Sequence, residues 1–243
     1  MPDNGLMAVS PDKKIQVWDL PVRFFHWTLV ILMVVSYFTG KAGKDWMTLH
    51  FWSGYGILTL LIFRIVWGFV GSTTARFSNF VKGPSAGIHH LREMFLPAHV
   101  SVGGPREAGH NPVGGAMVVV LIVAVLAQAA AGLFSVDTDT GMVNGPLYNK
   151  VASATAEQIT AFHKFWVNVL IVLAGLHILA AIVYLVWKRQ NLIGAMFTGT
   201  KPARHVHAPD ALPPVLAFAS NGLAISLLVA SAALVYFIVR LGS

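Results

Sequence analysis

The chain has 243 residues, of which 56% are hydrophobic and only 11% are charged, whereas soluble domains carry about 25% charged residues. This composition excludes an ordinary soluble domain and predicts an integral membrane protein. The lack of cysteine excludes disulfides, cysteine-ligated iron–sulfur clusters and haem attached through C-x-x-C-H. The formal net charge of +7 is typical of a membrane protein with basic cytoplasmic loops, so we expect membrane lipid and no nucleic acid as a partner.

Five apolar segments are each long enough to cross a hydrocarbon core about 30 Å thick. In chain order they cover about residues 22–40, 46–70, 113–134, 160–187 and 213–241. The sequence therefore predicts an all-α integral membrane fold. It consists of a four-helix transmembrane bundle followed by a fifth, C-terminal transmembrane helix.

Three regions follow from these spans, and the basic residues indicate their orientation. We expect a cytoplasmic segment at 1–17, a four-helix core at 18–201 and a basic loop with the fifth helix at 202–243. Within the core, a cytoplasmic connection covers about 71–112. Lysine and arginine are concentrated in the N-terminal segment, in this connection and in the loop after the fourth span. The positive-inside rule then predicts a multi-pass membrane protein with its N-terminus in the cytoplasm and its C-terminus outside.

Four histidines lie inside or at the ends of these spans, at His26, His50, His163 and His177. An ionisable side chain within a membrane is costly and usually functional. His163 and His177 are fourteen residues apart on one predicted helix. At about 100° per residue both rings leave nearly the same helix face, about 21 Å apart along the axis. One helix therefore presents two imidazoles to one interior, one near each membrane surface.

The order of the spans pairs these histidines by depth. His26 and His177 lie toward the cytoplasm, whereas His50 and His163 lie toward the outer face. Neutral imidazole is a common axial ligand of haem iron, and each pair joins two different helices. The pattern predicts two non-covalent b haems, one for each pair. The alternative is that the histidines form hydrogen bonds within a polar core, while a non-haem iron or zinc site is disfavoured because no carboxylate lies at the same depth.

Two arginines and a glycine are candidates to surround these haems. Arg64 lies on the His50 face of the second span at the inner level, where a buried arginine needs a partner such as a haem propionate. Arg23 precedes His26 by one turn and is either a propionate partner or a positive-inside anchor. Gly54 lies one turn after His50, where it either admits a flat macrocycle or allows close helix packing.

Lysines at the predicted outer level have two interpretations. Lys41, Lys44 and Lys164 either interact with the outer haem or attract an anion, or they extend to the membrane surface and are simply solvated. We treat the remaining histidines as solvated loop residues, namely His89, His90, His99, His110, His205 and His207.

Several motifs resemble those of the bacterial cytochrome b561 and nickel–iron hydrogenase cytochrome b family, and they occur in the same order over about residues 15–201. They are V-W-D-L-P-V-R-F-F-H-W (Val17–Trp27), L-H-F-W-S-G-Y-G (Leu49–Gly56), G-H-N-P-V-G-G (Gly109–Gly115), F-H-K-F-W-V-N (Phe162–Asn168) and N-L-I-G-A-M-F-T-G (Asn191–Gly199). The resemblance implies a four-helix core with two b haems and the same four histidines as iron ligands. It also implies electron transfer in the bacterial inner membrane between the quinone pool and a redox partner on the periplasmic side, where we expect the C-terminus. For the quinone, we expect a lipid-accessible cleft at the inner side near Arg64, Arg76 and the segment Gly109–Pro112. The fifth span is additional to the family core.

Three functions remain open from the sequence. The leading hypothesis is a di-haem cytochrome b that transfers electrons between quinone and a periplasmic cytochrome c or other redox protein. The second is an enzyme that acts alone as a superoxide:quinone oxidoreductase, with the outer lysines attracting the anion. The third is a membrane anchor subunit that docks a periplasmic cytochrome or hydrogenase.

Overall fold

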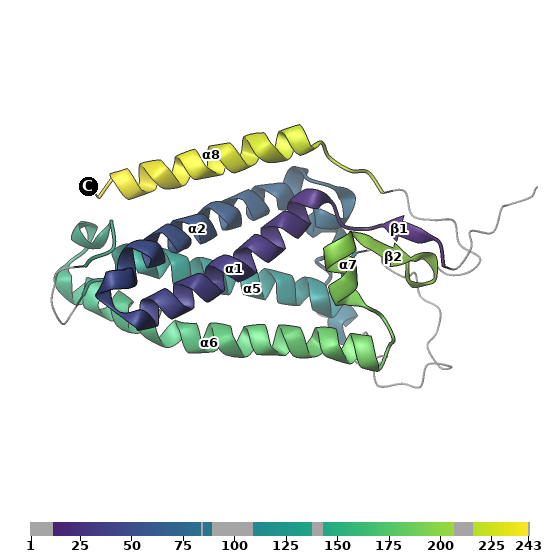
Figure 1. The fold of residues 1–243 in the computed structure, drawn as a ribbon, viewed down its shortest axis with the longest axis horizontal. Helices are drawn as coiled ribbons and strands as arrows, with labels where there is room; N and C mark the ends of the chain where they lie inside the picture. The colour runs from purple at the N-terminus through teal and green to yellow at the C-terminus, as the bar shows by residue number, and fades with distance from the viewer. Residues whose placement is uncertain (1–11, 84, 89–108, 138–142, 207–215, 243) are drawn as a thin grey trace, which may run out of the picture.

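The computed structural model describes residues 12–83, 85–88, 109–137, 143–206 and 216–242. Within these ranges, five helices are long and apolar enough to cross a membrane, which confirms the predicted all-α integral membrane fold. The five are α1 (Leu20–Ala42), α2 (Met47–Val70), α5 (Pro112–Phe134), α6 (Ser153–Val186) and α8 (Asn221–Arg240). Figure 1 shows their long axes running the length of the molecule.

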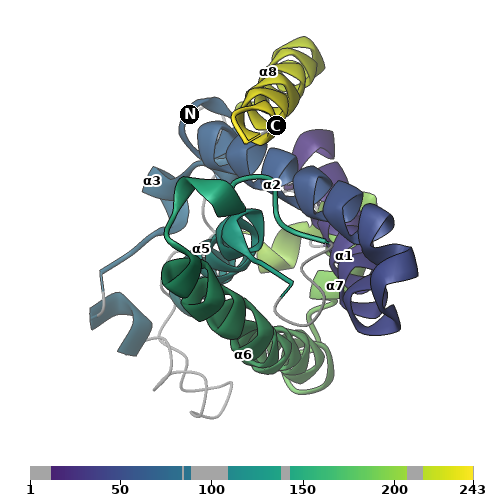
Figure 2. The same ribbon diagram turned by 90° about the vertical axis from the view of Figure 1, so that its left-hand side faces the viewer.

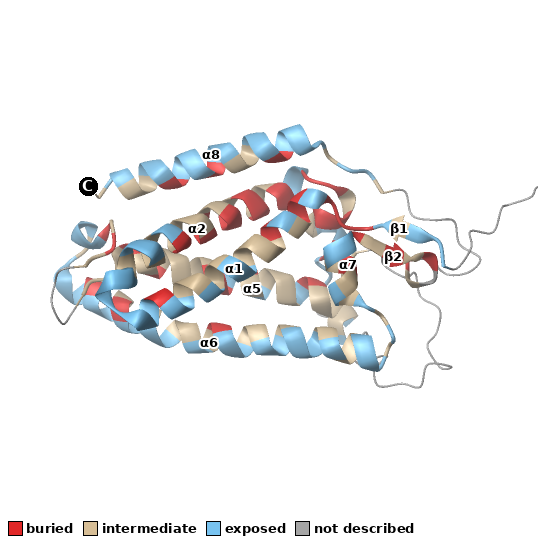
Figure 3. Cartoon of the chain, in the orientation of Figure 1, coloured by how far each residue is buried: buried red, intermediate tan, exposed pale blue. Residues whose placement is uncertain are grey.

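The four core helices form two antiparallel hairpins. A short 3-10 helix, η1 (Lys44–Trp46), joins α1 to α2, and α5 packs against α6. Helix α2 is central because it also contacts α5 and α8. Figure 2 shows α1, α2, α5 and α6 around a common interior, with α8 outside them against α2. The burial pattern agrees, since α2 carries many buried residues and α6 is largely exposed (Figure 3).

Local sequence explains where these helices begin. Asp19 caps α1 because its side chain accepts a hydrogen bond from the Val22 backbone, and a proline follows in the first turn. Asn111 caps α5 in the same way, again with a proline in the first turn. Such polar caps with an early proline satisfy the free N–H groups of the first turn. Ser220 caps α8 through the Leu223 backbone.

One end of the bundle is closed by elements that are not transmembrane. Strand β1 (Lys14–Gln16) pairs antiparallel with β2 (Thr200–Pro202), and Ile15 lies opposite Lys201. The short helix α7 (Leu192–Thr198) precedes β2 and ends at Gly199, which has a φ of 81°. We call this the sheet end, and the end that carries η1 the opposite end (Figure 1).

The structure differs from the sequence-based spans in three places. Helix α6 begins at Ser153, seven residues before the predicted span, because its first two turns are polar and carry no hydropathy signal. Helix α8 begins at Asn221, after the Ser220 cap, whereas the apolar run suggested a start near 213. The β1–β2 ribbon was not predicted, because strands of three residues leave too short a pattern to detect.

Candidate functional site

The four predicted histidines meet in two pairs. The His26 ring on α1 faces the His177 ring on α6 with 6.4 Å between ring centroids. The His50 ring on α2 faces His163 on α6 with 6.3 Å between centroids. These are the pairs expected from depth, the first at the sheet end and the second at the opposite end.

The spacing within each pair suits one metal ion between the two rings. A metal–imidazole nitrogen bond is about 2 Å long, so two axial rings on one metal have centroids about 6 Å apart. Across the described ranges, no group of three or more His, Cys, Asp and Glu side chains is arranged to hold a metal ion unaided. The donor set of each pair therefore fits an iron whose remaining ligands come from a macrocycle.

At the opposite end, backbone carbonyls fix both rings. His50 Nδ1 lies 2.9 Å from the Ser36 carbonyl oxygen, and His163 Nδ1 lies 3.0 Å from the Gln128 carbonyl oxygen. A carbonyl oxygen only accepts hydrogen bonds, so each Nδ1 carries the proton and each Nε2 keeps its lone pair. This tautomer is the one that an Nε2 metal ligand requires.

Glycines provide room around the rings and along the interior. A Cβ added at Gly40 would come within 3.1 Å of the His50 ring, and one at Gly132 would come within 3.1 Å of His163. A Cβ added at Gly54 or Gly175 would meet no atom within 4 Å. The predicted role of Gly54 beside a macrocycle is compatible with this open space.

At the sheet end, three buried polar atoms lack hydrogen-bond partners among the described residues. They are His26 Nδ1, Arg64 Nη1 and His110 Nδ1. The Arg64 side chain is 2% exposed, and its guanidinium carbon lies 5.1 Å from the centre of the Phe77 ring. Buried polar groups are normally paired, because leaving one unpaired costs about 1–3 kcal/mol. A carboxylate such as a haem propionate could pair with the arginine, and its predicted role as a propionate partner stays a prediction.

His110 lies in the loop before α5, as expected, but its ring packs against aromatic side chains of the sheet end, so its assignment as solvated was wrong. Its ring lies 4.6 Å from Trp18 and 4.8 Å from Phe80, measured between centroids. Burial, followed by the positive charges of Arg64 and Lys201, lowers the pKa of His110 to about 3. His110 is therefore neutral at physiological pH. Of the other histidines expected in loops, His205 is half-buried in η4 (Ala203–His205). The others, His89, His90, His99 and His207, lie outside the described residues.

Lys201 joins the ribbon to the loop before α5. Its Nζ donates a hydrogen bond to the Gly109 carbonyl oxygen at 3.0 Å and lies 5.6 Å from the Trp18 ring. Burial lowers the pKa of Lys201 to about 8. Arg76, which we expected near a quinone, donates through Nε to the Gly71 carbonyl oxygen at 2.8 Å.

Arg23 contacts α7 instead of the histidine pair. Its Nε donates to the Met196 carbonyl oxygen at 3.4 Å, and an Nη donates to the carbonyl oxygen of Phe197. Trp27 stacks on the Phe197 ring at 4.0 Å and also donates to Met196. These contacts favour a structural role for Arg23 in holding α7 against α1.

The lysines of the opposite end are solvent-facing. Lys41, Lys44 and Lys164 are all exposed, and Lys164 follows His163 directly in the sequence. Gln128 is the polar neighbour of this pair, since its Nε2 donates to the His163 carbonyl oxygen at 3.1 Å and lies 3.4 Å from His163 Nε2.

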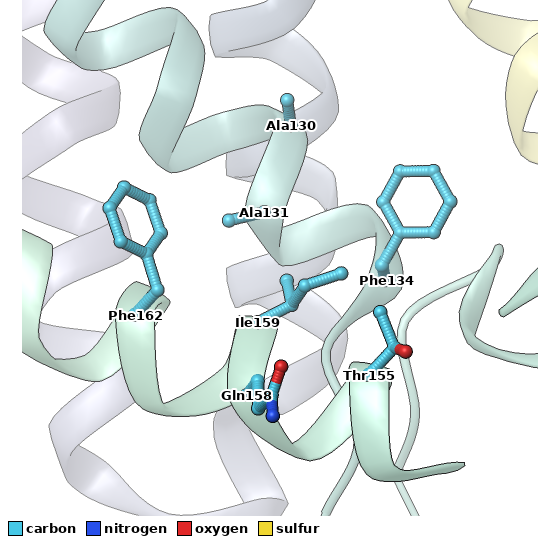
Figure 4. Close-up of a pocket in the computed structure, with 7 residues that line it drawn as sticks. All are labelled: Ala130, Ala131, Phe134, Thr155, Gln158, Ile159 and Phe162. Carbon is cyan, nitrogen blue, oxygen red and sulfur yellow. The ribbon is translucent and has the colours of Figure 1, made fainter. Parts of the chain in front are cut away.

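A pocket of about 370 Å³ opens between α5 and α6 near the opposite end (Figure 4). Phe134, Ile159 and Phe162 give it a mainly apolar wall, to which Thr155 and Gln158 add polar atoms (Figure 4). Phe162 directly precedes His163 in the chain. The pocket therefore lies at the other end of the molecule from the segment Gly109–Pro112, where we expected a quinone.

Two residues of the sheet end were missed by sequence reasoning. Asp19 accepts a hydrogen bond from Trp67 Nε1 at 3.0 Å as well as capping α1. His110 directly precedes the Asn111 cap. In both cases the sequence has an Asp or Asn cap followed by an early proline. This pattern could have identified these positions as the starts of membrane-spanning helices at the sheet end.

Comparison with known proteins supports the membrane cytochrome interpretation. Residues 17–199 match the family model described as prokaryotic cytochrome b561. A probable Ni/Fe-hydrogenase B-type cytochrome subunit from Rhizobium leguminosarum bv. viciae is 24% identical over 213 residues, which cover 78% of this chain and 89% of the relative. Proteins of the same description from Bradyrhizobium diazoefficiens and Azotobacter vinelandii are each 23% identical, covering 78% and 81% of this chain and 87% and 92% of the relatives. No solved structure matches the chain.

Proposed function

Because the chain belongs to the prokaryotic cytochrome b561 family, a family of membrane cytochromes b that transfer electrons, we propose that it is a di-haem member of that family. It would carry electrons across the bacterial inner membrane between the quinone pool and a redox partner on the outer face. The observation that carries this proposal is the occurrence of two histidine pairs with nearly equal spacing, one toward each end of the bundle. With only one pair, an electron would have to cross about 21 Å of apolar helix, the axial distance between His163 and His177, without a second haem.

Each haem would be held by side chains from two hairpins. His26 and His50 come from the α1–α2 hairpin, and both of their partners come from α6. Haem, when bound, supplies one-electron chemistry at an iron with two imidazole ligands. The chain positions the imidazoles, and its apolar helices exclude water. Arg64 offers a buried positive charge to a propionate.

The redox partner is proposed from the relatives. Their descriptions name a Ni/Fe-hydrogenase. We therefore propose a hydrogenase, as well as a cytochrome c, as a possible class of redox partner for this chain. A quinone would reach the bundle from the lipid. We propose that its head group binds at the sheet end, near Arg64, Arg76 and the segment Gly109–Pro112.

Haem quantitation tests the proposal directly. The purified protein should give a b-type reduced-minus-oxidised spectrum, and its pyridine haemochrome should account for two haems per chain. His177→Ala and His163→Ala should each remove one haem. His205→Ala, a histidine outside both pairs, should keep two. A folded preparation that contains no haem would overturn the proposal.

A further inference from the structure

We propose that Arg64 and His110 together bind one propionate of the sheet-end haem in the interior of the protein. Arg64 supplies the positive charge, and His110 Nδ1 supplies a second hydrogen-bond donor. His110 is thereby a haem-binding residue outside both histidine pairs. The inference rests on the proposed di-haem function and extends it from the iron ligands to the edge of the macrocycle.

Arg64 lies at the level of the sheet-end histidine pair. It follows His50 by fourteen residues on α2, which is about 21 Å along the helix axis. His177 follows His163 by the same number of residues on α6. His50 and His163 face each other at the opposite end. The same rise along the two helices therefore brings Arg64 and His177 to one level.

Both proposed donors are buried, and neither is paired within the part of the chain that the structure describes. Arg64 Nη1 and His110 Nδ1 have no hydrogen-bond partner there, and the Arg64 side chain is 2% exposed. The Arg64 guanidinium carbon lies 6.0 Å from the centre of the Phe80 ring, and the His110 ring lies 4.8 Å from it between centroids. The two donors are therefore neighbours of one aromatic ring, and a single acceptor with two oxygens suits both.

The side chains packed around these donors are aromatic. The His110 ring lies 4.6 Å from Trp18 between centroids, and the Arg64 guanidinium carbon lies 5.1 Å from the centre of Phe77. Aromatic faces attract a cation, but Trp and Phe side chains offer no oxygen to an N–H donor. An acceptor for both donors must therefore come from another group.

The buried charges of the sheet end are unbalanced. Among the described residues, the buried charged side chains are Asp19, Arg64 and Lys201. Burial lowers the pKa of Lys201 to about 8, so Lys201 is mainly protonated at neutral pH and two cations accompany one carboxylate. Asp19 already accepts hydrogen bonds from Val22 and Trp67. A buried charge needs a partner of opposite sign, which a propionate supplies and a water molecule does not.

His110 is suited to act as a neutral donor beside Arg64. Burial, followed by the positive charge of Arg64, lowers the pKa of His110 to about 3. A neutral imidazole carries one N–H, so it adds a hydrogen bond to a carboxylate without adding charge. Lys201 Nζ donates to the Gly109 carbonyl oxygen at 3.0 Å, which fixes the backbone directly before His110.

The opposite end offers a haem different contacts. Its lysines Lys41, Lys44 and Lys164 are exposed, so a propionate there would meet solvated charges that salt screens. Its two ligand rings donate to the carbonyl oxygens of Ser36 and Gln128. The sheet-end site should therefore depend on a haem carboxylate more strongly than the opposite site does.

Haem release from the purified full-length protein tests the role of His110. Apomyoglobin in excess takes up any haem that leaves, and absorbance follows the transfer. His110→Phe keeps an aromatic ring but removes the N–H, whereas His110→Asn keeps an N–H donor and loses the ring. We expect His110→Phe to release one of its two haems about tenfold faster, because a hydrogen bond to a charged group is lost. His110→Asn should stay closer to the unaltered protein, and the reverse order would show that His110 only packs and would overturn the inference.

Resonance Raman spectroscopy gives a signature that a purely packing role would not change. The bending vibration of a haem propionate shifts when its carboxylate loses a hydrogen bond, so His110→Phe should shift one propionate line. Arg64→Met should shift the same line, and Arg64→Lys should restore most of it. If Arg64→Met does not fold, the two His110 variants decide. An unmoved line in His110→Phe, with haem release that depends on chloride, would place a free anion between the donors and overturn the propionate assignment.

His205→Phe is the matched control, because His205 lies in η4 at the same end of the molecule and outside both pairs. It should change neither the release of haem nor the propionate lines. Two haems with unchanged release and unchanged lines in His110→Phe would contradict this inference alone. A folded protein without haem would contradict the proposed function as well.

Discussion

At the scale of single residues, Asp19 links two helices at the sheet end. It is 4% exposed and accepts hydrogen bonds from the Val22 backbone at 2.8 Å and from Trp67 Nε1 at 3.0 Å. Trp67 is fully buried, so its indole N–H cannot form a hydrogen bond to solvent. One carboxylate therefore caps α1 and satisfies a tryptophan of α2.

Asp19→Ala should destabilise the protein by about 2–4 kcal/mol, because it removes a helix cap and leaves a buried N–H unpaired. Asp19→Asn retains an acceptor for the cap and should cost less. Denaturant titrations in detergent micelles, followed by far-ultraviolet circular dichroism, compare the two. Equal losses for both variants would mean that the negative charge matters more than the hydrogen bonds.

The four histidines were predictable because helix periodicity and span order are local properties of the sequence. Their pairing follows from topology, and the structure has the same pairs. The partner of Arg23 was not predictable, because α7 folds back onto α1 across more than 170 residues. His110 was misjudged for the same reason, since Trp18 and Phe80 reach it from distant segments.

At the scale of elements, α7 depends on its contacts with α1. A helix of seven residues is unstable by itself. Arg23 donates to the carbonyl oxygens at its C-terminal end, and Trp27 stacks on Phe197. These contacts, with the αL residue Gly199, hold α7 across the sheet end.

Arg23→Gln combined with Trp27→Leu should release α7. Amide hydrogen exchange over residues 192–198 should then become at least tenfold faster, because the helix opens without global unfolding. Lys188→Gln, in the turn just after α6, serves as a control because Lys188 makes none of these contacts. Unchanged exchange in the double variant would show that the contacts of α7 with α6 and with the β1–β2 ribbon are enough to hold it.

Helix α8 is a second element whose role follows from its place. It packs on the outer side of α2, and Ala224, Ser231 and Val235 are its buried residues. It contributes no histidine to either pair. A chain that ends after residue 206 should therefore still bind two haems, with a lower melting temperature. Loss of haem from the shortened chain, measured by pyridine haemochrome, would contradict this prediction.

At the scale of the whole molecule, the predicted orientation in the membrane can be tested by chemical labelling. The chain has no cysteine, so the labelling of a single introduced cysteine shows whether that one position is accessible to the reagent. Lys14 and Lys150 are exposed at opposite ends of the bundle. Lys150→Cys should react with a membrane-impermeant maleimide added to spheroplasts. Lys14→Cys should react only after the membrane is opened, and the reverse pattern would invert the topology.

The transmembrane arrangement as a whole was largely predictable, because twenty-residue apolar runs carry a strong signal. The extra turns of α6 were not, since Ser153 to Ile159 is too polar to look like a membrane span. The ribbon at the sheet end depends on two segments that meet only in the folded protein. Short strands of this kind have no pattern of their own.

The ribbon also sets an order of events during synthesis. Gln16 cannot pair with Thr200 until the ribosome has added nearly all of the core. At about 5–20 residues per second, the first strand waits roughly 10–40 s without its partner. Helix α7 and the ribbon are therefore the last parts of the core to form, and they complete the sheet end only after all four core helices have been made.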